Sequence, residues 1–166
     1  MSETLADDVV TRLSSAADAA SVRAALSGRA DVMEMTQATH DAALMPADPG
    51  GLSHGLRAAL AVRIARLNED EALAAHYARL LENAGASADE AAAADPDFKG
   101  GGRLAAAIAF TDLVTMRTRE TTAADIEALR KVGISDADIV RLAELNAFLA
   151  YQVRVIAGLK LMRATA

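Results

Sequence analysis

Apolar side chains recur every three or four residues along most of this chain, the pattern of helices that bury one face. The clearest example follows Ser53, a hydroxyl residue suited to cap a helix, and carries Leu56, Leu60 and Ile64 on one face. Weaker stripes predict three further helices in the N-terminal third. These run from Thr4 to Leu13, from Ser21 to Gly28, and from Asp31 to Pro46.

The stretch from Leu67 to Gly85, LNEDEALAAHYARLLENAG, predicts the next helix. Asn68 is suited to cap its N-terminus, and the acidic residues that follow it favour the positive end of the helix dipole. We therefore expect a helix over 69–84. Gly85 would supply the left-handed conformation that ends many helices.

Hydroxyl residues followed three positions later by an acid mark helix starts in the C-terminal half, because the two side chains can satisfy free backbone N–H groups. These pairs are Ser87 with Glu90, Thr122 with Asp125, and Ser135 with Asp138. The last pair precedes the longest apolar stripe, in which Leu142 and Leu149 are predicted core residues. The stretch DPDFKGGG, residues 95–102, is predicted to be the most flexible point inside the chain.

The composition favours an all-α fold. Aromatic residues make up 3% of the chain and Trp is absent, whereas alanine, the best helix former, dominates the 52% hydrophobic fraction. The 166 residues fit a single domain, which we divide into an N-terminal helical extension over 1–50 and a core over 51–166. Because alanine faces bury little area, we expect a homo-oligomer, from dimer to hexamer, to complete the burial.

Charge and residue usage exclude several kinds of function. The net charge is −6, the pI is near 5.0 and the basic residues are scattered, so we expect no nucleic-acid partner. Cysteine is absent, which removes thiol nucleophiles, disulfides and thiolate metal sites. His40 and His54 have no second histidine at helical spacing, so we expect both at the surface, with no metal and no cofactor. The acidic N-terminal stretch and the lack of a long apolar run predict a cytoplasmic protein without membrane association.

His76 and Tyr77 interrupt the apolar part of the helix that follows Asn68, and two interpretations stay open. His76 could be a neutral core histidine, with Tyr77 at the boundary and its hydroxyl in water. Alternatively, His76 is a general acid/base in a pocket between helices, with Glu69 or Asp70 setting its pKa.

Residues 52–85, LSHGLRAALAVRIARLNEDEALAAHYARLLENAG, resemble the core helix pair of the AhpD-like, carboxymuconolactone decarboxylase (CMD) superfamily. That core has a Leu-Ser and an Arg, then an apolar helix, an Asn-Gly, a Cys-x-x-Cys and a His pair. The matching residues here are Leu52-Ser53, Arg57, Asn68 and His76-Tyr77. Residues 121–159 resemble the same family's C-terminal helices. The resemblance implies an AhpD-like helical bundle behind a divergent N-terminal helical extension.

The redox residues of that family are missing from this chain. Peroxidase members use a Glu to help activate two Cys, and the matching positions here are Ala58, Asp70 and Leu73. Tyr77 replaces the second His. A thiol peroxidase needs one thiolate to attack the peroxide and a second thiol to resolve the sulfenic acid, so we reject that activity.

Two functions then remain. The first is a small-molecule-binding or assembly protein, with a cysteine-bearing relative as one candidate partner. The second is an acid/base enzyme resembling the carboxymuconolactone decarboxylases, acting on a lactone or keto acid. In that hypothesis His76 moves protons and Glu69 or Asp70 orients it. The pocket residues are Arg57, which neutralises a substrate carboxylate, together with Asp70, Leu73 and Tyr77.

Overall fold

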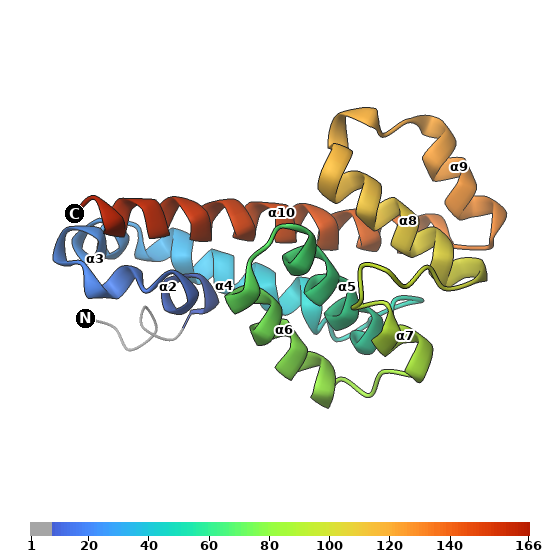
Figure 1. The fold of residues 1–166 in the computed structure, drawn as a ribbon, viewed down its shortest axis with the longest axis horizontal. Helices are drawn as coiled ribbons and strands as arrows, with labels where there is room; N and C mark the ends of the chain where they lie inside the picture. The colour runs from blue at the N-terminus through green and yellow to red at the C-terminus, as the bar shows by residue number, and fades with distance from the viewer. Residues whose placement is uncertain (1–7) are drawn as a thin grey trace.

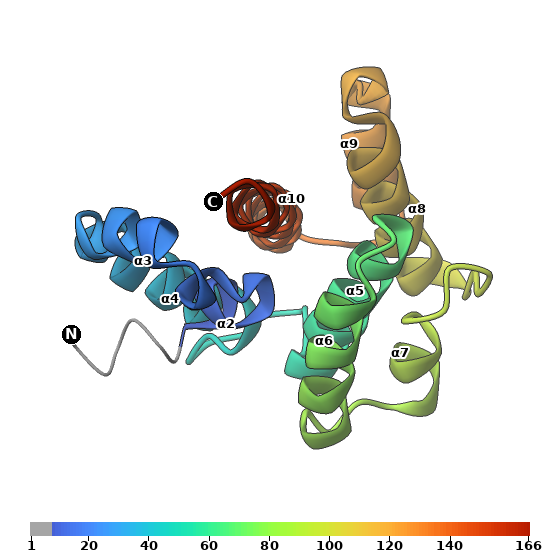
Figure 2. The same cartoon turned by 60° about the vertical axis from the view of Figure 1, so that its left-hand side comes forward.

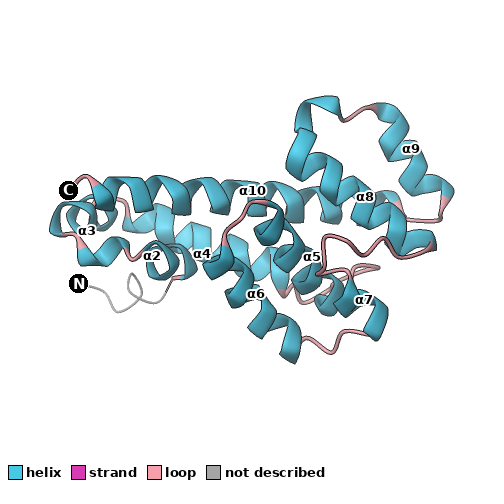
Figure 3. Ribbon diagram, viewed as in Figure 1, coloured by secondary structure: helices cyan, strands magenta, loops and turns pink. Residues whose placement is uncertain are grey.

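The computed structural model describes residues 8–166, and every regular element in this range is a helix (Figure 1 and Figure 3). The α-helices are α2 (Val9–Ser14), α3 (Ala20–Ser27), α4 (Ala30–Leu44), α5 (His54–Leu67), α6 (Glu71–Asn83), α7 (Ala88–Ala92), α8 (Gly102–Arg117), α9 (Ala123–Lys131) and α10 (Asp136–Ala164). Two short 3-10 helices, η1 (Ala16–Asp18) and η2 (Thr118–Glu120), join them. The predicted all-α fold is confirmed. The first residues of the helix expected over Thr4–Leu13 lie outside the described range.

The longest helix, α10, is the spine along which the other elements pack (Figure 1). Viewed nearly along its axis, α3 and α4 lie on one side of α10, and α5, α8 and α9 lie on the other (Figure 2). Helix α2 packs on the C-terminal part of the spine, beside α6 in Figure 1. Of the helices in residues 8–166, none is both long enough and apolar enough for a bilayer crossing.

Helix α5 forms the centre of the core. Every side chain from Gly55 to Ala65 is buried, including those of Arg57 and Arg63. The helix packs most extensively against α6, and also against α8 and α10. Leu142 and Leu149 of α10 are fully buried in the same core, as predicted.

Most of the predicted helix ends are confirmed, because the capping side chains act as their spacing suggests. Ser53 accepts a hydrogen bond from the Leu56 N–H at 3.0 Å. Full capping boxes form at Ser87–Glu90 and Thr122–Asp125, Ser135 caps α10, and Gly85 follows α6 with φ of 65°.

The prediction that Asn68 caps α6 is wrong. Asn68 instead closes α5, and its side-chain amide donates to the carbonyl of Ile64 at 2.8 Å. Asp70 is the N-cap, because its carboxylate accepts from the Leu73 N–H at 3.1 Å. Helix α6 therefore begins at Glu71, two residues later than expected.

The glycine-rich stretch 95–102, predicted to be the most flexible segment, is fixed by a buried arginine. Arg63 is 0% exposed, and its guanidinium pairs with both carboxylate oxygens of Asp112 on α8. The same group donates to backbone carbonyls in and just before the loop, those of Ala93, Asp95, Pro96 and Phe98. The guanidinium therefore ties this loop to α5 and α8.

Candidate functional site

The two positions that match the family's cysteines carry structural contacts in this chain. Asp70 caps α6 and also pairs with Lys160 of α10, with Oδ2 and Nζ 3.0 Å apart. Leu73 is fully buried in the core. Ala58, at the position of the activating Glu, is also fully buried. In this chain the three positions therefore contribute a helix cap and core packing.

The turn between α5 and α6 keeps a conformation typical of glycine. Glu69 has φ of 57°, in the left-handed region that L residues with a side chain rarely adopt. It occupies the position that matches the Gly of the Asn-Gly in the resemblance described above. Its side chain is exposed, and within residues 8–166 it makes no hydrogen bond to His76. The structure therefore does not bring Glu69 to His76.

Arg57, expected to meet a substrate carboxylate, supports the loop before α5. It is 3% exposed. Its guanidinium donates to the carbonyl oxygens of Leu52, Ala43 and Pro49 at 2.9, 2.8 and 3.2 Å. Burial is the main cause that lowers the pKa of Arg57, followed by the nearby charge of Arg141. A ligand could reach this group only by displacing the loop.

His76 and Tyr77 do come together, and a third aromatic residue joins them. The rings of His40 and Tyr77 stack with centroids 5.9 Å apart, and His40 and His76 lie 5.8 Å apart. His40, on α4, is 8% exposed, so its expected surface position is wrong. The reason is that His40 is on the α4 face that carries Leu44 into the core.

Tyr77 is fully buried, which corrects the expectation that its hydroxyl reaches water. The hydroxyl donates to the side-chain oxygen of Gln152 on α10. Burial raises the pKa of Tyr77 far above its usual value, and the bond to Gln152 opposes this only in part. Tyr77 is therefore a neutral packing group that joins α6 to the spine.

Arg12 of α2 determines the tautomer of His76. A guanidinium can only donate, so the 3.3 Å contact between Arg12 and Nδ1 of His76 makes Nδ1 an acceptor. The neutral ring then carries its proton on Nε2. Burial first, and then the charges of Arg12, His40 and Arg79, lower the pKa of His76 from 6.5 to about 4.

His40 has the opposite arrangement. Its Nδ1 lies 2.9 Å from a carboxylate oxygen of Asp41, which can only accept, and 3.3 Å from the side-chain nitrogen of Gln37, which donates to the same carboxylate at 2.8 Å. The shorter contact, to Asp41, favours the proton on Nδ1. In the neutral ring Nε2 is therefore an acceptor. Within residues 8–166, neither this Nε2 nor Nε2 of His76 has a hydrogen-bond partner, and both atoms are buried. One buried donor and one buried acceptor thus lie in neighbouring rings.

These two histidines are poorly arranged for a metal ion. A metal needs a lone pair on the ligating nitrogen, but the bond from Arg12 leaves the lone pair of His76 on Nδ1. The guanidinium also adds a positive charge next to the ring. The donor set suits an uncharged polar group better than a cation.

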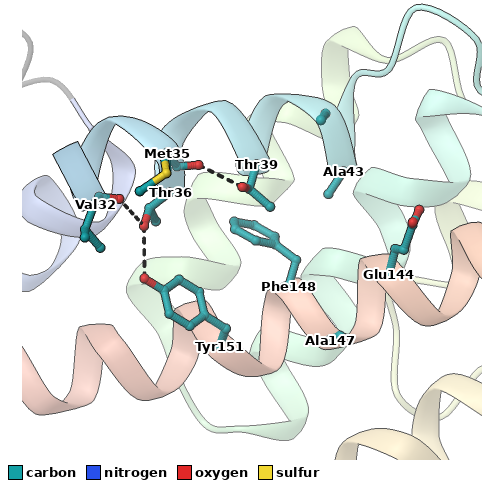
Figure 4. Close-up of a pocket in the computed structure, with 10 residues that line it drawn as sticks. Val32, Met35, Thr36, Thr39, Ala43, Glu144, Ala147, Phe148 and Tyr151 are labelled. Carbon is teal, nitrogen blue, oxygen red and sulfur yellow. Dashed lines mark hydrogen bonds between the residues drawn. The ribbon is translucent and has the colours of Figure 1, made fainter.

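A groove lies on the other side of Phe148 from this cluster. It has a volume of about 620 Å³ and runs between α4 and α10 (Figure 4). Phe148 lines the groove and turns its ring toward His40, with centroids 6.0 Å apart. Thr36 and Tyr151 join the two helices across the groove through a 2.9 Å hydrogen bond between their hydroxyls (Figure 4).

The sequence carried a signal for some of the missed residues. Gln152 interrupts the apolar stripe of α10 between Leu149 and Ile156, and a polar residue at such a position indicates a buried partner. His40 is four residues before the buried Leu44. Nothing in the local sequence links Arg12 to His76, because α2 meets α6 only in the folded chain.

The arrangement of the helices and the state of the site define a class: an all-α protein with the AhpD-like fold whose thiol positions hold no cysteine. The resemblance predicted from the sequence is thereby confirmed at the level of the fold. One similar solved structure is described as an alkylhydroperoxidase AhpD core, an uncharacterized peroxidase-related protein from Ralstonia eutropha JMP134. It has a TM-score of 0.65 and 28% sequence identity, over 78% of this chain and 69% of its own.

A second solved structure shows the same fold. It is an uncharacterized peroxidase-related protein from Silicibacter sp. TM1040, with a TM-score of 0.65, 22% identity, and coverage of 78% of this chain and 68% of its own. Neither a protein-family profile nor a curated protein sequence matches the chain.

Proposed function

We propose that this chain is a binding protein that holds a small uncharged polar molecule between His40 and His76, and that it has no thiol peroxidase activity. The observation that carries the proposal is the pair of buried Nε2 atoms, one a donor and one an acceptor, without partners in residues 8–166. Leaving such groups unpaired costs free energy, so a ligand or water that pairs with both is favoured.

A hydroxyl group suits this pair, because it can accept from His76 and donate to His40 at once. A carbonyl group would satisfy His76 alone. A carboxylate would be disfavoured, because Nε2 of His40 is an acceptor and the negatively charged carboxylate of Asp41 lies on the other side of the same ring. We therefore expect alcohols, including hydroxylated lactones, to bind better than simple acids.

The chemistry of the family's peroxidases has no basis in this chain. Cysteine is absent, and the two matching positions contribute a helix cap and a core leucine. Neither an aspartate nor a leucine can form the sulfenic acid and disulfide of that cycle.

Thermal unfolding in the presence of short alcohols, hydroxylated γ-lactones and β-keto acids tests the proposal. A ligand at 100 times its dissociation constant should stabilise the fold by about 2.7 kcal/mol. We expect His40→Gln and His76→Gln to abolish that shift. His54→Gln is the matched control, because His54 bonds to the Pro46 carbonyl outside this cluster and should leave the shift unchanged. Equal shifts in all three variants, or no shift with any compound, would contradict the proposal.

An acid/base enzyme acting on a lactone or keto acid is the second candidate, favoured by the same donor and acceptor pair. His76 is a weak base for this task, because its pKa of about 4 is far below the optimum for a base working near neutral pH. The enzyme hypothesis would be supported if the wild type turns over a lactone and His76→Gln binds the same compound without turnover.

A further inference from the structure

The exposed face of α10 carries a heptad pattern. Val140, Glu144, Ala147, Tyr151, Arg154 and Gly158 are spaced by four and three residues, so they lie along one face of the helix. All six are exposed, and the two largest apolar members, Val140 and Tyr151, are 56% and 41% exposed.

Helix α4 continues the same apolar surface. Val32, Met35, Thr39 and Ala42 follow spacings of three, four and three, and together with α10 they line the groove of about 620 Å³ (Figure 4). Met35 is 59% exposed there. The two antiparallel helices thus present one joint surface, of the kind that completes a four-helix bundle when a second pair packs on it.

The pattern on α10 is complementary to itself. If two α10 helices pack antiparallel about a two-fold axis at residue 149, Glu144 of each copy lies opposite Arg154 of the other. The same register sets Val140 opposite Gly158, and Tyr151 opposite Ala147. Each pair thus joins opposite charges or a large residue with a small one. A two-fold interface requires this kind of self-complementarity.

Gly158 provides an independent observation. It lies in the interior of α10, where glycine costs about 1 kcal/mol relative to alanine. A Cβ built at Gly158 would meet no atom within 4 Å in residues 8–166, so the single chain gives no reason for a glycine. Close approach of a second helix gives one, because it leaves room for the side chain opposite.

We propose that a second copy of this chain covers the α4–α10 surface, with the two α10 helices antiparallel and Glu144 of each copy paired with Arg154 of the other. The surface from Val140 to Gly158 extends over about 27 Å of helix. In this register the partner's Tyr151 packs against Ala147, and the hydroxyl of each Tyr151 keeps its hydrogen bond to Thr36 of its own chain. This goes beyond the ligand site, since that site is formed by α2, α4 and α6 on the other side of Phe148.

A charge-swap experiment tests both the partner and the register. We expect sedimentation equilibrium to show a dimer for the wild type. Glu144→Arg and Arg154→Glu should each raise the dimer dissociation constant about tenfold or more, because each places like charges opposite one another. The double variant should recover dimerisation, which only a direct pairing of the two positions predicts.

Glu82→Arg is the matched control, because it makes the same charge change on an exposed position of α6. It should leave the dimer intact, and circular dichroism should show that all variants keep the fold. A monomeric wild type, single variants that dimerise normally, or a double variant that does not recover would each overturn the proposal.

Discussion

The guanidinium of Arg12 donates to Nδ1 of His76 across 3.3 Å, which holds a cation against an imidazole that must stay neutral. The contact joins α2 to α6. It fixes the tautomer of His76, and its charge adds to the lowering of the His76 pKa, of which burial is the main cause. The pH dependence of stability should therefore report on this contact.

We predict that the fold loses stability as the pH falls from about 6.5 toward 4. The unfolded chain takes up a proton on His76 near pH 6.5, whereas the folded chain does so only near pH 4. Acid therefore favours the unfolded state in this window. Because the ring is only partly buried, screening limits the loss to about 2 kcal/mol at most.

Urea unfolding at several pH values checks this prediction. His76→Gln cannot titrate, so its stability should fall less than that of the wild type between pH 6.5 and 4. Parallel curves for the two proteins would show that His76 titrates normally.

Removal of the buried Arg63 should destabilise the fold strongly. Arg63→Met leaves the carboxylate of Asp112 and several loop carbonyls without their donor, and the loss of one member of a buried ion pair costs about 3–5 kcal/mol. Arg66→Met is the control, because exposed Arg66 makes a single hydrogen bond to the Ala94 carbonyl. It should change the free energy of unfolding by less than about 1 kcal/mol. Similar losses in both variants would show that Arg63 does not hold the loop.

Asp70 should stabilise the fold mainly as the N-cap of α6. Asp70→Ala removes the acceptor for the Leu73 N–H and should cost about 1 kcal/mol. Asp70→Asn keeps an oxygen that can cap the helix but loses the charge facing Lys160. Since Lys160 is partly exposed, the asparagine variant should lie within about 1 kcal/mol of the wild type. Thermal unfolding of both variants distinguishes the cap from the ion pair, and a larger loss for asparagine would contradict this assignment.

Leu149→Ala should cost about 2–5 kcal/mol, because this fully buried side chain leaves a cavity in the centre of the core. Met116, on α8, is 56% exposed and is the matched control. Met116→Ala should change stability by less than about 0.5 kcal/mol. Denaturant titration measures both, and equal effects would place Leu149 outside the core.

The sequence predicted those parts of the fold that depend on residues close together along the chain. The caps at Ser53, Ser87 and Ser135 are confirmed because a hydroxyl and an N–H three positions away need no distant partner. The first residue of α6 was harder to predict from the sequence. Both Asn68 and Asp70 are good caps, and the choice depends on how far α5 extends before the turn.

The candidate site was predicted only in part, since its members come from three helices. His76 and Tyr77 were singled out because they interrupt the apolar part of a predicted helix, and the resemblance to a known family then matched them to its His pair. His40 and Arg12 reach them from α4 and α2, and no local pattern shows which distant helices will pack together. The loop at 95–102 was predicted to be flexible because of its glycines. Arg63, which fixes it, is more than thirty residues earlier in the sequence.

The left-handed backbone of Glu69 has a consequence for protein engineering. A glutamate tolerates this conformation only when the helices on either side enforce it, at a cost on the order of 1 kcal/mol. The geometry of this helical hairpin is therefore set by the packing of α5 and α6 and not by the side chains at the turn. New side chains could be installed along the first turns of α6 without redesigning the bend that presents them.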